Sequence, residues 1–241
     1  DHDAYLLDVF RVVGGSEQAR LMHSTFARLT TCGLTLRSLE DELFLATWRN
    51  AVMRNYQIDP SPAPTWQVDW QIEDRYGYLP AGADIHLRCT DFTTGAQAMI
   101  AEAWVSVGGF NSDEEAWIPC LITRRVSAST PLASTFVAVI EPYAVQPKIA
   151  TLRRLTFGDD THVVVEARLS DGRRDVLVVT DPLAEDHSAL PDAIGSMCGF
   201  RFDGDLCVVR FDLEDCPTPL VVEDGRLEFE STNRQSLIVD A

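Results

Sequence analysis

The sequence predicts an all-β fold, with a large antiparallel β-sandwich over residues 1–150 and a smaller, hairpin-rich antiparallel β domain over residues 151–241. Three observations support this prediction. Residues 116–143 hold two long runs of β-branched and aromatic residues, and residues 66–73 alternate apolar and polar side chains, as a strand with one buried face does. Three Asp-Gly dipeptides, each between apolar runs, are typical of tight turns between antiparallel strands.

Composition bounds the class of protein. The chain has 241 residues, of which 46% are hydrophobic, and this is enough to bury a sizeable core. The formal charge of −17 argues against a nucleic acid or an anionic membrane as the partner, because both repel an acidic surface. No apolar run approaches the ~20 residues of a membrane span. The opening DHDAYLLDVF lacks the basic start of a signal peptide, so we expect a longer parent chain that carries any targeting signal elsewhere.

The six cysteines show no C-x-x-C pair, which excludes the spacing of a zinc ribbon. We expect most of them to be buried thiols. Cys198, Cys207 and Cys216 are nine residues apart, a spacing that leaves open a disulfide between adjacent strands.

The first predicted elements are two strands. Residues 4–13 carry apolar side chains on both faces, which predicts a strand covered on both sides. Gly14 and Gly15 then mark a tight turn, and residues 19–29 return as a second strand that carries His23. The prediction is a hairpin with a histidine on it.

A helix and a linker are predicted next. Ser38 and Asp41 resemble the start of a capping box, and apolar residues at helical spacing predict a helix over residues 39–54. The Pro-rich residues 58–65 continue neither a helix nor a central strand, so they are predicted to form a surface connection.

The middle of the chain is predicted to be strands. Trp66, Val68, Trp70 and Ile72 fall on one face of a strand, and Gln67, Asp69, Gln71 and Glu73 fall on the other, so one face is buried and the other is solvated. Strands are also predicted over residues 84–92 and 96–107. The two runs within residues 116–143 form either a core hairpin or two core strands of neighbouring sheets.

The last third is predicted to be a series of hairpins. Their turns are Asp171-Gly172, Asp203-Gly204 and Asp224-Gly225. The corresponding strand pairs are residues 163–169 with 175–179, 200–202 with 206–211, and 220–222 with 227–229.

Two segments carry a family resemblance. The opening AYLLDVFRVVGGSEQARLMHSTF and the later PCLITRRVSASTPLASTFVAVIEPY resemble segments of heparinase II/III-like polysaccharide lyases. The resemblance implies a supersandwich-like β-sandwich and a smaller β domain. It also implies an N-terminal α/α toroid, which we expect upstream of these residues in the parent chain. It also implies a secreted or periplasmic protein whose partner is a polysaccharide, such as a glycosaminoglycan or another uronate-containing polymer.

The resemblance has a departure near the Gly-Gly pair. Gln18 stands where family members often have a histidine, His23 matches their second histidine, and Ser24 replaces the glycine that follows it. Some members hold a structural zinc ion with histidine and aspartate, and only His23 and Asp8 are suitably placed for it here. Asp159-Asp160, Asp186 and the acidic tail are most simply explained as solvated loops. Calcium is the alternative there, although the ligand spacing of a known calcium loop is missing.

The implied chemistry is β-elimination, in which a base removes the proton next to a uronate carboxylate and an acid protonates the leaving oxygen. The candidate catalytic residue is His23, and the candidate substrate-binding residues are Arg11, Arg124, Arg125 and Tyr143. Each also has a structural explanation. His23 suits a hydrogen-bonded core or interface position, and Tyr143 suits packing at a strand end.

The arginines have structural explanations too. Arg11 suits a buried ion pair with Glu141 that would hold the sandwich together. Arg124 and Arg125 are adjacent, so they point to opposite faces of a strand and only one of them can lie in a core or cleft.

Two functions are therefore predicted. The first is the C-terminal β-sandwich region of a polysaccharide lyase, forming part of the catalytic cleft and inactive alone. The second is a non-catalytic β-sandwich module that binds carbohydrate or protein, which the loss of a histidine at Gln18 favours.

Overall fold

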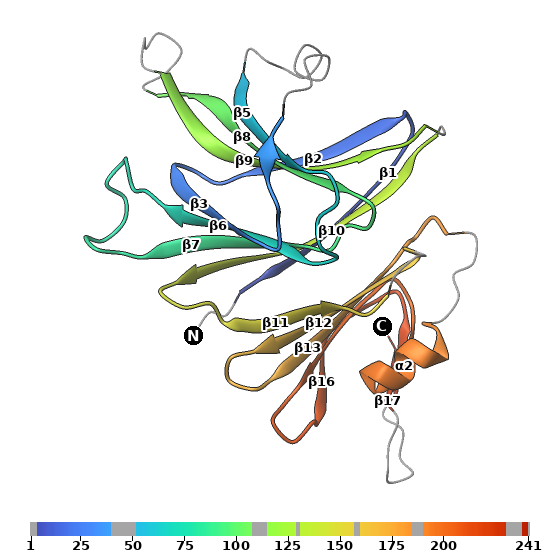
Figure 1. The fold of residues 1–241 in the computed structure, drawn as a ribbon. Coiled ribbons are helices and arrows are strands. Elements are labelled where there is room, and N and C mark those ends of the chain that lie inside the picture. Colours follow the sequence, from blue (N-terminus) through green and yellow to red (C-terminus); the bar gives the residue numbers. More distant parts are fainter. Residues whose placement is uncertain are drawn as a thin grey trace. The chain divides into compact units, whose positions relative to one another are not determined.

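The computed structural model describes residues 4–39, 52–107, 115–128, 131–156, 160–184, 190–229 and 238–240. Within these residues every regular element is a strand except one helix of seven residues, and the sheet neighbours pair antiparallel, so the fold is all-β, as predicted. The chain forms two compact units, which we call the N-terminal unit (Asp1–Gln146) and the C-terminal unit (Pro147–Ala241) (Figure 1). No helix within the described residues is long and apolar enough to cross a membrane.

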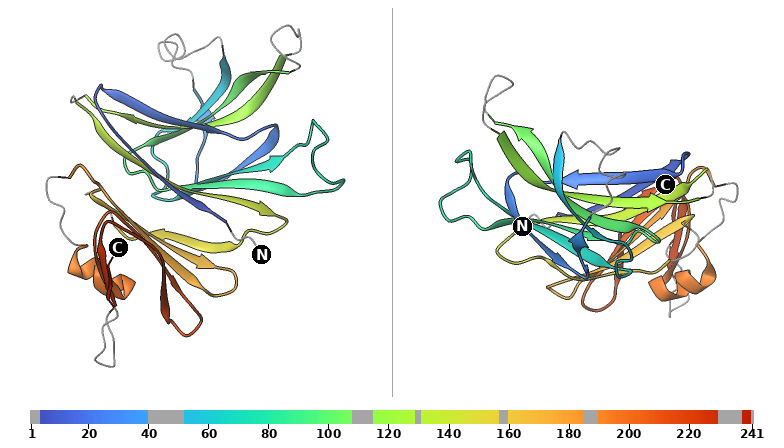
Figure 2. Two further views of the ribbon diagram at one scale, coloured as in Figure 1. Left: turned by 180° about the vertical axis from the view of Figure 1, so that it is seen from behind. Right: turned by 45° about the horizontal axis from the view of Figure 1, so that its top comes forward.

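The N-terminal unit is a sandwich of two five-stranded sheets, seen as stacked layers in Figures 1 and 2. In spatial order, the first sheet contains β1 (Leu6–Val13), β10 (Ala133–Ala144), β7 (Ile85–Asp91), β6 (Trp66–Ile72) and β3 (Ala27–Cys32). The second sheet contains β2 (Glu17–His23), β9 (Glu115–Val126), β8 (Gln97–Ser106), β5 (Met53–Asp59) and β4 (Arg37–Ser38).

The core of this unit confirms the alternation in β6. Trp66, Val68 and Trp70 are buried against residues of both sheets, including Leu121 of β9. The intervening residues of β6 are only half-buried. A period of two therefore identified the core face of this strand.

The two long central strands lie in different sheets, because β9 belongs to the second sheet and β10 to the first. Of the two predicted arrangements, the one with strands of neighbouring sheets is correct. Phe136, Val137, Ala138 and Val139 are buried in succession, as expected for a strand covered on both faces. By contrast, β1 is an edge strand and is less covered than predicted.

The predicted hairpin around Gly14 and Gly15 is wrong. β1 pairs with β10, whereas β2 pairs with β9, so the two glycines carry the chain from one sheet to the other. The predicted second strand also breaks at residues 24–26 into β2 and β3, which lie in different sheets. Gln18 secures the crossing, because its Nε2 donates to the carbonyl oxygens of Gly14 at 2.7 Å and Leu132 at 2.8 Å.

The predicted helix over residues 39–54 falls largely on residues 40–51, outside the described residues. Its final part is wrong, because β5 begins at Met53. The linker is shorter than predicted, since β5 continues through Ile58 to Asp59, and the exposed connection begins at Pro60. The Asp59 carboxylate accepts hydrogen bonds from the backbone N–H of Ser61 and Thr35.

The C-terminal unit contains two sheets and the short helix α2 (Asp192–Cys198). The third sheet contains β11 (Ile149–Arg154), β12 (His162–Leu169), β13 (Arg174–Thr180), β15 (Leu206–Phe211) and β16 (Pro217–Glu223). The fourth sheet contains β14 (Phe200–Asp203), β17 (Arg226–Phe229) and β18 (Ile238–Asp240). Its core joins Val164 and Val176 of the third sheet, Phe200 and Leu227 of the fourth, and Cys198 of α2.

The predicted hairpin at Asp171-Gly172 is confirmed, because β12 pairs with β13. The other two Asp-Gly predictions are wrong. β14 pairs with β17, and β16 pairs with β15, so each dipeptide connects the fourth sheet with the third.

The two wrong predictions have one physical cause. The segments β14–β15 and β16–β17 run antiparallel beside each other and bend together from one sheet into the next. At this bend a Cβ on Gly225 would overlap the carbonyl oxygen of Asp203, and a Cβ on Gly204 would meet the Cα of Gly225 at 2.5 Å. The glycines thus allow the two neighbouring segments to approach closely at the bend, and neither glycine reverses the chain in a hairpin turn.

The cysteines match the expectation of buried thiols for four of the six. All six are free, and Cys89, Cys120, Cys198 and Cys207 are buried. Burial raises the pKa of the Cys198 and Cys120 thiols to about 11, which keeps them protonated and inert near neutral pH.

Candidate functional site

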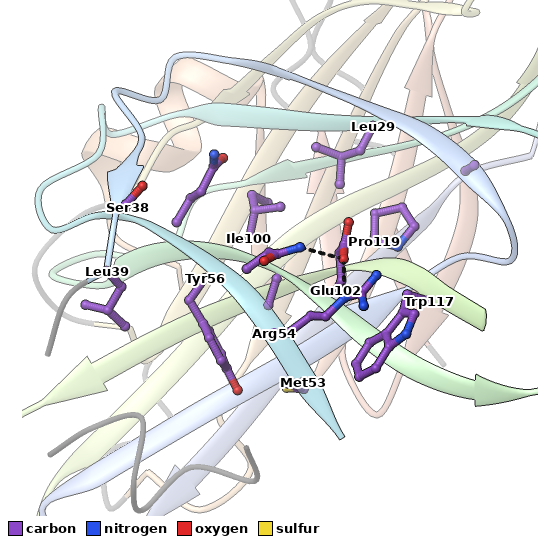
Figure 3. Close-up of a pocket in the computed structure, with 14 residues that line it drawn as sticks. Leu29, Ser38, Leu39, Met53, Arg54, Tyr56, Ile100, Glu102, Trp117 and Pro119 are labelled. Carbon is purple, nitrogen blue, oxygen red and sulfur yellow. Dashed lines mark hydrogen bonds and ion pairs between the residues drawn. The ribbon is translucent and has the colours of Figure 1, made fainter. Parts of the chain in front are cut away.

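A cleft of about 1000 Å³ lies in the N-terminal unit, lined by β3 of the first sheet and by β4, β5, β8 and β9 of the second (Figure 3). Leu29, Ile100 and Pro119 supply apolar lining. Arg54, Asn55 and Gln57 of β5, Glu102 of β8 and Trp117 of β9 supply polar and aromatic groups. We call this the sheet cleft.

Glu102 is the polar centre of the sheet cleft. Its Oε2 accepts hydrogen bonds from Arg54 Nε at 2.7 Å and from Asn55 Nδ2 at 2.8 Å. The side chains of Glu102 and Arg54 are 40% and 49% exposed. Such an exposed ion pair contributes little to stability, but its remaining donors and acceptors are open to a ligand.

A β-bulge places Asn55 beside Glu102. The pairing of β5 with β8 shifts register between Arg54 and Gln57, and Asn55 has a left-handed φ of 54°. Asparagine tolerates this conformation better than most residues, and a bulge re-aims a side chain out of the regular alternation. The amide of Asn55 and the guanidinium of Arg54 consequently reach the same carboxylate.

The sheet cleft has an aromatic side. The Arg54 guanidinium lies 4.1 Å from the centroid of the Trp117 ring, a cation–π contact. Trp104 of β8 is directly opposite Trp117, so both rings are on one face of the sheet. Trp104 is 39% exposed and extends the aromatic surface.

A second polar cluster lies on the first sheet, away from the sheet cleft. The rings of His86 and Tyr143 stack with centroids 4.7 Å apart. Tyr143 Oη donates to Asp69 Oδ2 at 2.6 Å, and the His86 nitrogens lie 2.6 Å from Asp69 Oδ1 and 3.0 Å from Asp84 Oδ1. We call these four residues the His–Tyr cluster.

Both rings of the His–Tyr cluster have raised pKa values. Burial alone would lower the pKa of His86, but the hydrogen bonds and charges of Asp69 and Asp84 outweigh it and raise this pKa. Burial and the Asp69 carboxylate raise the pKa of Tyr143. Tyr143 therefore stays a hydrogen-bond donor at neutral pH, and His86 holds its proton more tightly than in an unfolded chain.

The predicted ion pair between Arg11 and Glu141 is wrong. Glu141 of β10 pairs with Arg88 Nη2 of the neighbouring β7 at 2.5 Å. Arg11 lies opposite Thr135, six residues along β10 from Glu141, which is about 20 Å at the rise of a strand. Glu141 thus forms a buried ion pair, as predicted, but its partner is Arg88 instead of Arg11.

The structure does not gather the predicted site residues. His23 is at the end of β2, where its exposed ring places Nδ1 2.8 Å from the Ser24 carbonyl oxygen, so the predicted core position is wrong. Arg11 lies on the first sheet. Tyr143 does more than pack at a strand end, since it belongs to the His–Tyr cluster.

Arg124 and Arg125 point to opposite sides of β9, as their adjacency requires. Arg124 pairs with Glu17 at 2.7 Å and with Gln97 Oε1 at 2.8 Å. Arg125 Nη1 donates to the Ala133 carbonyl oxygen at 2.9 Å. Both guanidiniums thus tie β9 to neighbouring segments.

The described residues show no group of three His, Cys, Asp or Glu side chains that could hold a metal ion. Asp8, expected with His23 at a zinc site, instead accepts from Arg20 Nη1 at 2.9 Å. For the calcium alternative, Asp159 lies outside the described residues, and Asp160 pairs with Arg154.

Sequence reasoning missed the residues of the sheet cleft. The sequence pattern predicts a helix that includes Arg54 and a core strand that includes Trp117. A usable signal was the charged Glu102 two residues before Trp104 in a strand that otherwise holds small and apolar residues. No known family model matches the chain, and neither does the sequence of any curated protein.

Proposed function

We propose that the N-terminal unit binds carbohydrate in the sheet cleft without cleaving it. The observation that carries this proposal is the joint placement of Trp117, Arg54, Asn55 and Glu102 around one open cavity. A sugar ring has C–H groups on its faces and hydroxyls at its edge, so it needs an apolar aromatic face beside planar hydrogen-bonding groups. Tryptophan, carboxylate, amide and guanidinium groups supply that combination.

Charge favours a neutral sugar in this cleft. Arg54 and Glu102 neutralise each other through their ion pair, and the whole chain carries −17. A polyanion would gain no net attraction here, whereas hydroxyl groups can both donate to Glu102 and accept from Arg54 or Asn55. The supported ligand is a neutral stretch of polysaccharide.

The test is calorimetric titration of the chain with a panel of neutral oligosaccharides. Trp117→Ala is expected to weaken binding about tenfold or more, as truncation of an aromatic anchor does. Tyr78→Ala is the matched control, because Tyr78 is an exposed aromatic residue on the β6–β7 connection. Equal losses in both variants, or no binding of any oligosaccharide, would refute the proposal.

A second candidate function is the β-sandwich region of a heparinase II/III-like lyase, working with an α/α toroid in a longer chain. The His–Tyr cluster favours it, since it brings together a histidine, a tyrosine and the nearby Arg88, the residue types that elimination uses. Tyr143 and His86 both form hydrogen bonds with Asp69, however, so neither is free to act on a substrate. We therefore expect no elimination by this chain alone.

An assay for the unsaturated product of elimination separates the two functions. With uronate polymers and this chain alone, we expect no increase in product absorbance. Steady product formation that disappears in Tyr143→Phe and His86→Ala would replace the binding function with the lyase function. Loss of product formation in His23→Ala would instead identify His23 as the catalytic residue.

A further inference from the structure

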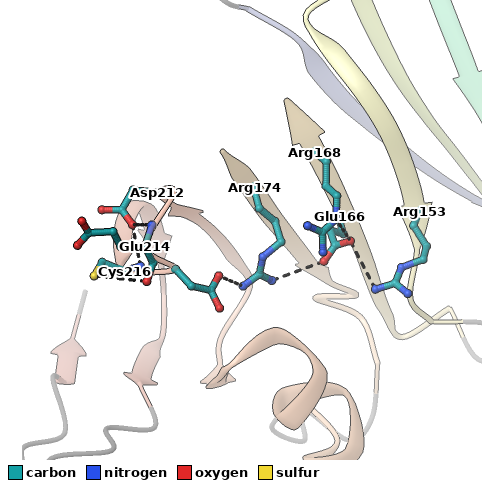
Figure 4. Close-up of polar contacts among 8 residues, drawn as sticks. Arg153, Glu166, Arg168, Arg174, Asp212, Glu214 and Cys216 are labelled. Atoms are coloured by element: carbon teal, nitrogen blue, oxygen red, sulfur yellow. Dashed lines mark hydrogen bonds and ion pairs between the residues drawn. The ribbon is translucent and has the colours of Figure 1, made fainter. Parts of the chain in front are cut away.

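Three arginines of the C-terminal unit surround one carboxylate on a single face of the third sheet (Figure 4). Glu166 of β12 is buried and lies opposite Arg153 of β11, while Arg168 of β12 lies opposite Arg174 of β13. The Glu166 carboxylate is 3.4 Å from Arg153 Nη2, 3.3 Å from Arg168 Nε and 3.5 Å from Arg174 Nη1. The Glu166 carboxylate thus lies among three guanidiniums, of which one, that of Arg174, also pairs with Asp215.

These contacts are longer than charge-assisted hydrogen bonds, which measure about 2.7–2.9 Å. Arg210 and Asp175 in the same sheet show the usual geometry, with two bonds of 2.7 Å. Glu166 therefore leaves much of the donor capacity around it unused. The directly opposed Arg168 and Arg174 also repel each other, and a second anion between them would relieve this repulsion.

The arginines combine one fixed side chain with two accessible ones. Arg174 lies 3.8 Å from the Phe211 ring centroid and pairs with Asp215 at 3.0 Å. Arg153 and Arg168 are each 57% exposed at a cavity of about 450 Å³. A ligand can therefore reach two guanidiniums while the third is held in place.

Besides Glu166, the cavity has two acidic residues, Asp212 and Asp215, and Asp212 lies at the end away from Arg153 and Arg168 (Figure 4). Asp215 is paired with Arg174, and Asp212 Oδ1 accepts the backbone N–H groups of Glu214 and Cys216 in the β15–β16 turn. At the other end, Arg153 and Arg168 share the single carboxylate of Glu166, so positive charge exceeds negative charge there.

We propose that Arg153, Arg168 and Arg174 bind the carboxylate or sulfate group of an acidic sugar in this cavity. The planar guanidinium fork matches the paired oxygens of both groups. The cavity is larger than a bare ion requires and falls in the size range of small-molecule sites. In a chain of charge −17, such a local arginine cluster is the feature an anionic ligand needs. The proposal is independent of the sheet cleft, which lies in the other unit.

The experiment titrates the whole chain with glucuronate, inorganic sulfate and glucose at low ionic strength. Glucuronate and sulfate are expected to bind, with affinity falling as salt is added. Any binding of glucose in the sheet cleft should change neither with salt nor in Arg153→Ala and Arg168→Ala. Arg153→Ala and Arg168→Ala should each weaken glucuronate binding about tenfold, since each removes a charged hydrogen-bond donor. Arg226→Ala is the matched control, because Arg226 is similarly exposed and pairs with Glu228 in the same unit.

Glu166→Gln supplies a test with the opposite sign. It removes the competing internal charge while keeping the side-chain shape, so glucuronate should bind about tenfold more tightly. If this variant is less stable, glucuronate should still raise its Tm, because the ligand binds only the folded state. Trp117→Ala should leave glucuronate binding unchanged, which separates this site from the sheet cleft.

Three results would overturn the proposal. In the first, sulfate binds but glucuronate does not. In the second, Arg226→Ala weakens glucuronate binding as much as Arg153→Ala and Arg168→Ala do. In the third, Glu166→Gln binds glucuronate more weakly than the unmodified chain, or glucuronate fails to raise its Tm.

Discussion

Arg20 of β2 donates through Nη2 to Oδ2 of Asp91 of β7 at 3.0 Å, and this ion pair joins the two sheets inside the N-terminal unit. Asp91 is fully buried and also accepts hydrogen bonds from Thr93 N at 2.8 Å and Thr123 Oγ1 at 3.0 Å. Arg20 bonds a second carboxylate, that of the half-buried Asp8. The core of the sandwich is therefore partly polar and fully hydrogen-bonded around Asp91.

Asp91→Ala is expected to destabilise the chain by about 3–5 kcal/mol, because it leaves the Arg20 charge in the core without its buried partner. Asp8→Ala is the matched control and should cost at most ~1 kcal/mol, since Asp8 is more exposed. Urea unfolding of both variants measures the difference. Equal costs would show that Arg20 is held as well by Asp8 as by Asp91.

Trp66→Ala or Trp70→Ala should each destabilise by about 3–5 kcal/mol, as truncation of a core aromatic does. Trp70 also donates through Nε1 to the Pro119 carbonyl oxygen at 3.1 Å, which links the sheets. Gln67→Ala on the other face should cost little. Asp69 on that face is not equivalent to Gln67, because it bonds Tyr143 and His86, so its substitution should be measurably destabilising.

The strands were more predictable than their pairing. Alternation or continuous apolar runs identified β6, β10 and β12, because these patterns are local and are fixed by which faces are buried. Pairing depends on contacts between distant residues. Gly14-Gly15, Asp203-Gly204 and Asp224-Gly225 all have turn residues, yet each takes the chain from one sheet to another. The dipeptide alone does not distinguish a reversal from a bend.

The sheet cleft could not be predicted for a similar reason. Its polar centre joins Arg54 and Asn55 to Glu102, nearly fifty residues later, through the pairing of β5 with β8. The bulge that re-aims Asn55 is also set by this pairing. In the C-terminal unit, Arg168 and Glu166 are two residues apart, but Arg153 joins them only through the pairing of β11 with β12.

Gly225→Ala should destabilise the C-terminal unit by about 1–3 kcal/mol, because its Cβ would overlap the Asp203 carbonyl oxygen and force the two strands apart. Gly77→Ala is a control for the effect of removing a glycine, since its added Cβ would meet nothing within 4 Å, although its positive φ adds backbone strain. Thermal unfolding of both variants gives the comparison. A Gly225→Ala loss no larger than that of Gly77→Ala would contradict the tight crossing.

His86 should make the stability of the chain decrease as pH rises above neutrality. Its pKa is raised in the folded state, so the folded chain holds this proton more tightly than the unfolded one, whose histidine pKa is about 6.5. The stabilisation is therefore complete below about pH 6.5 and is lost as the pH passes the higher folded-state value. The measurement is the urea midpoint between about pH 6 and pH 9.

His86→Gln removes the titrating group and should flatten this decrease, while keeping a side chain that can hydrogen-bond Asp69 or Asp84. His23→Gln is the matched control, because His23 is exposed and bonds a backbone carbonyl oxygen instead of a carboxylate, so the decrease should persist. Two results would contradict this prediction. In the first, His86→Gln leaves the pH dependence of stability unchanged. In the second, stability rises with pH through this range, and rises more steeply in the unmodified chain than in the variant. Either result would show that Asp69 and Asp84 do not hold a protonated imidazole.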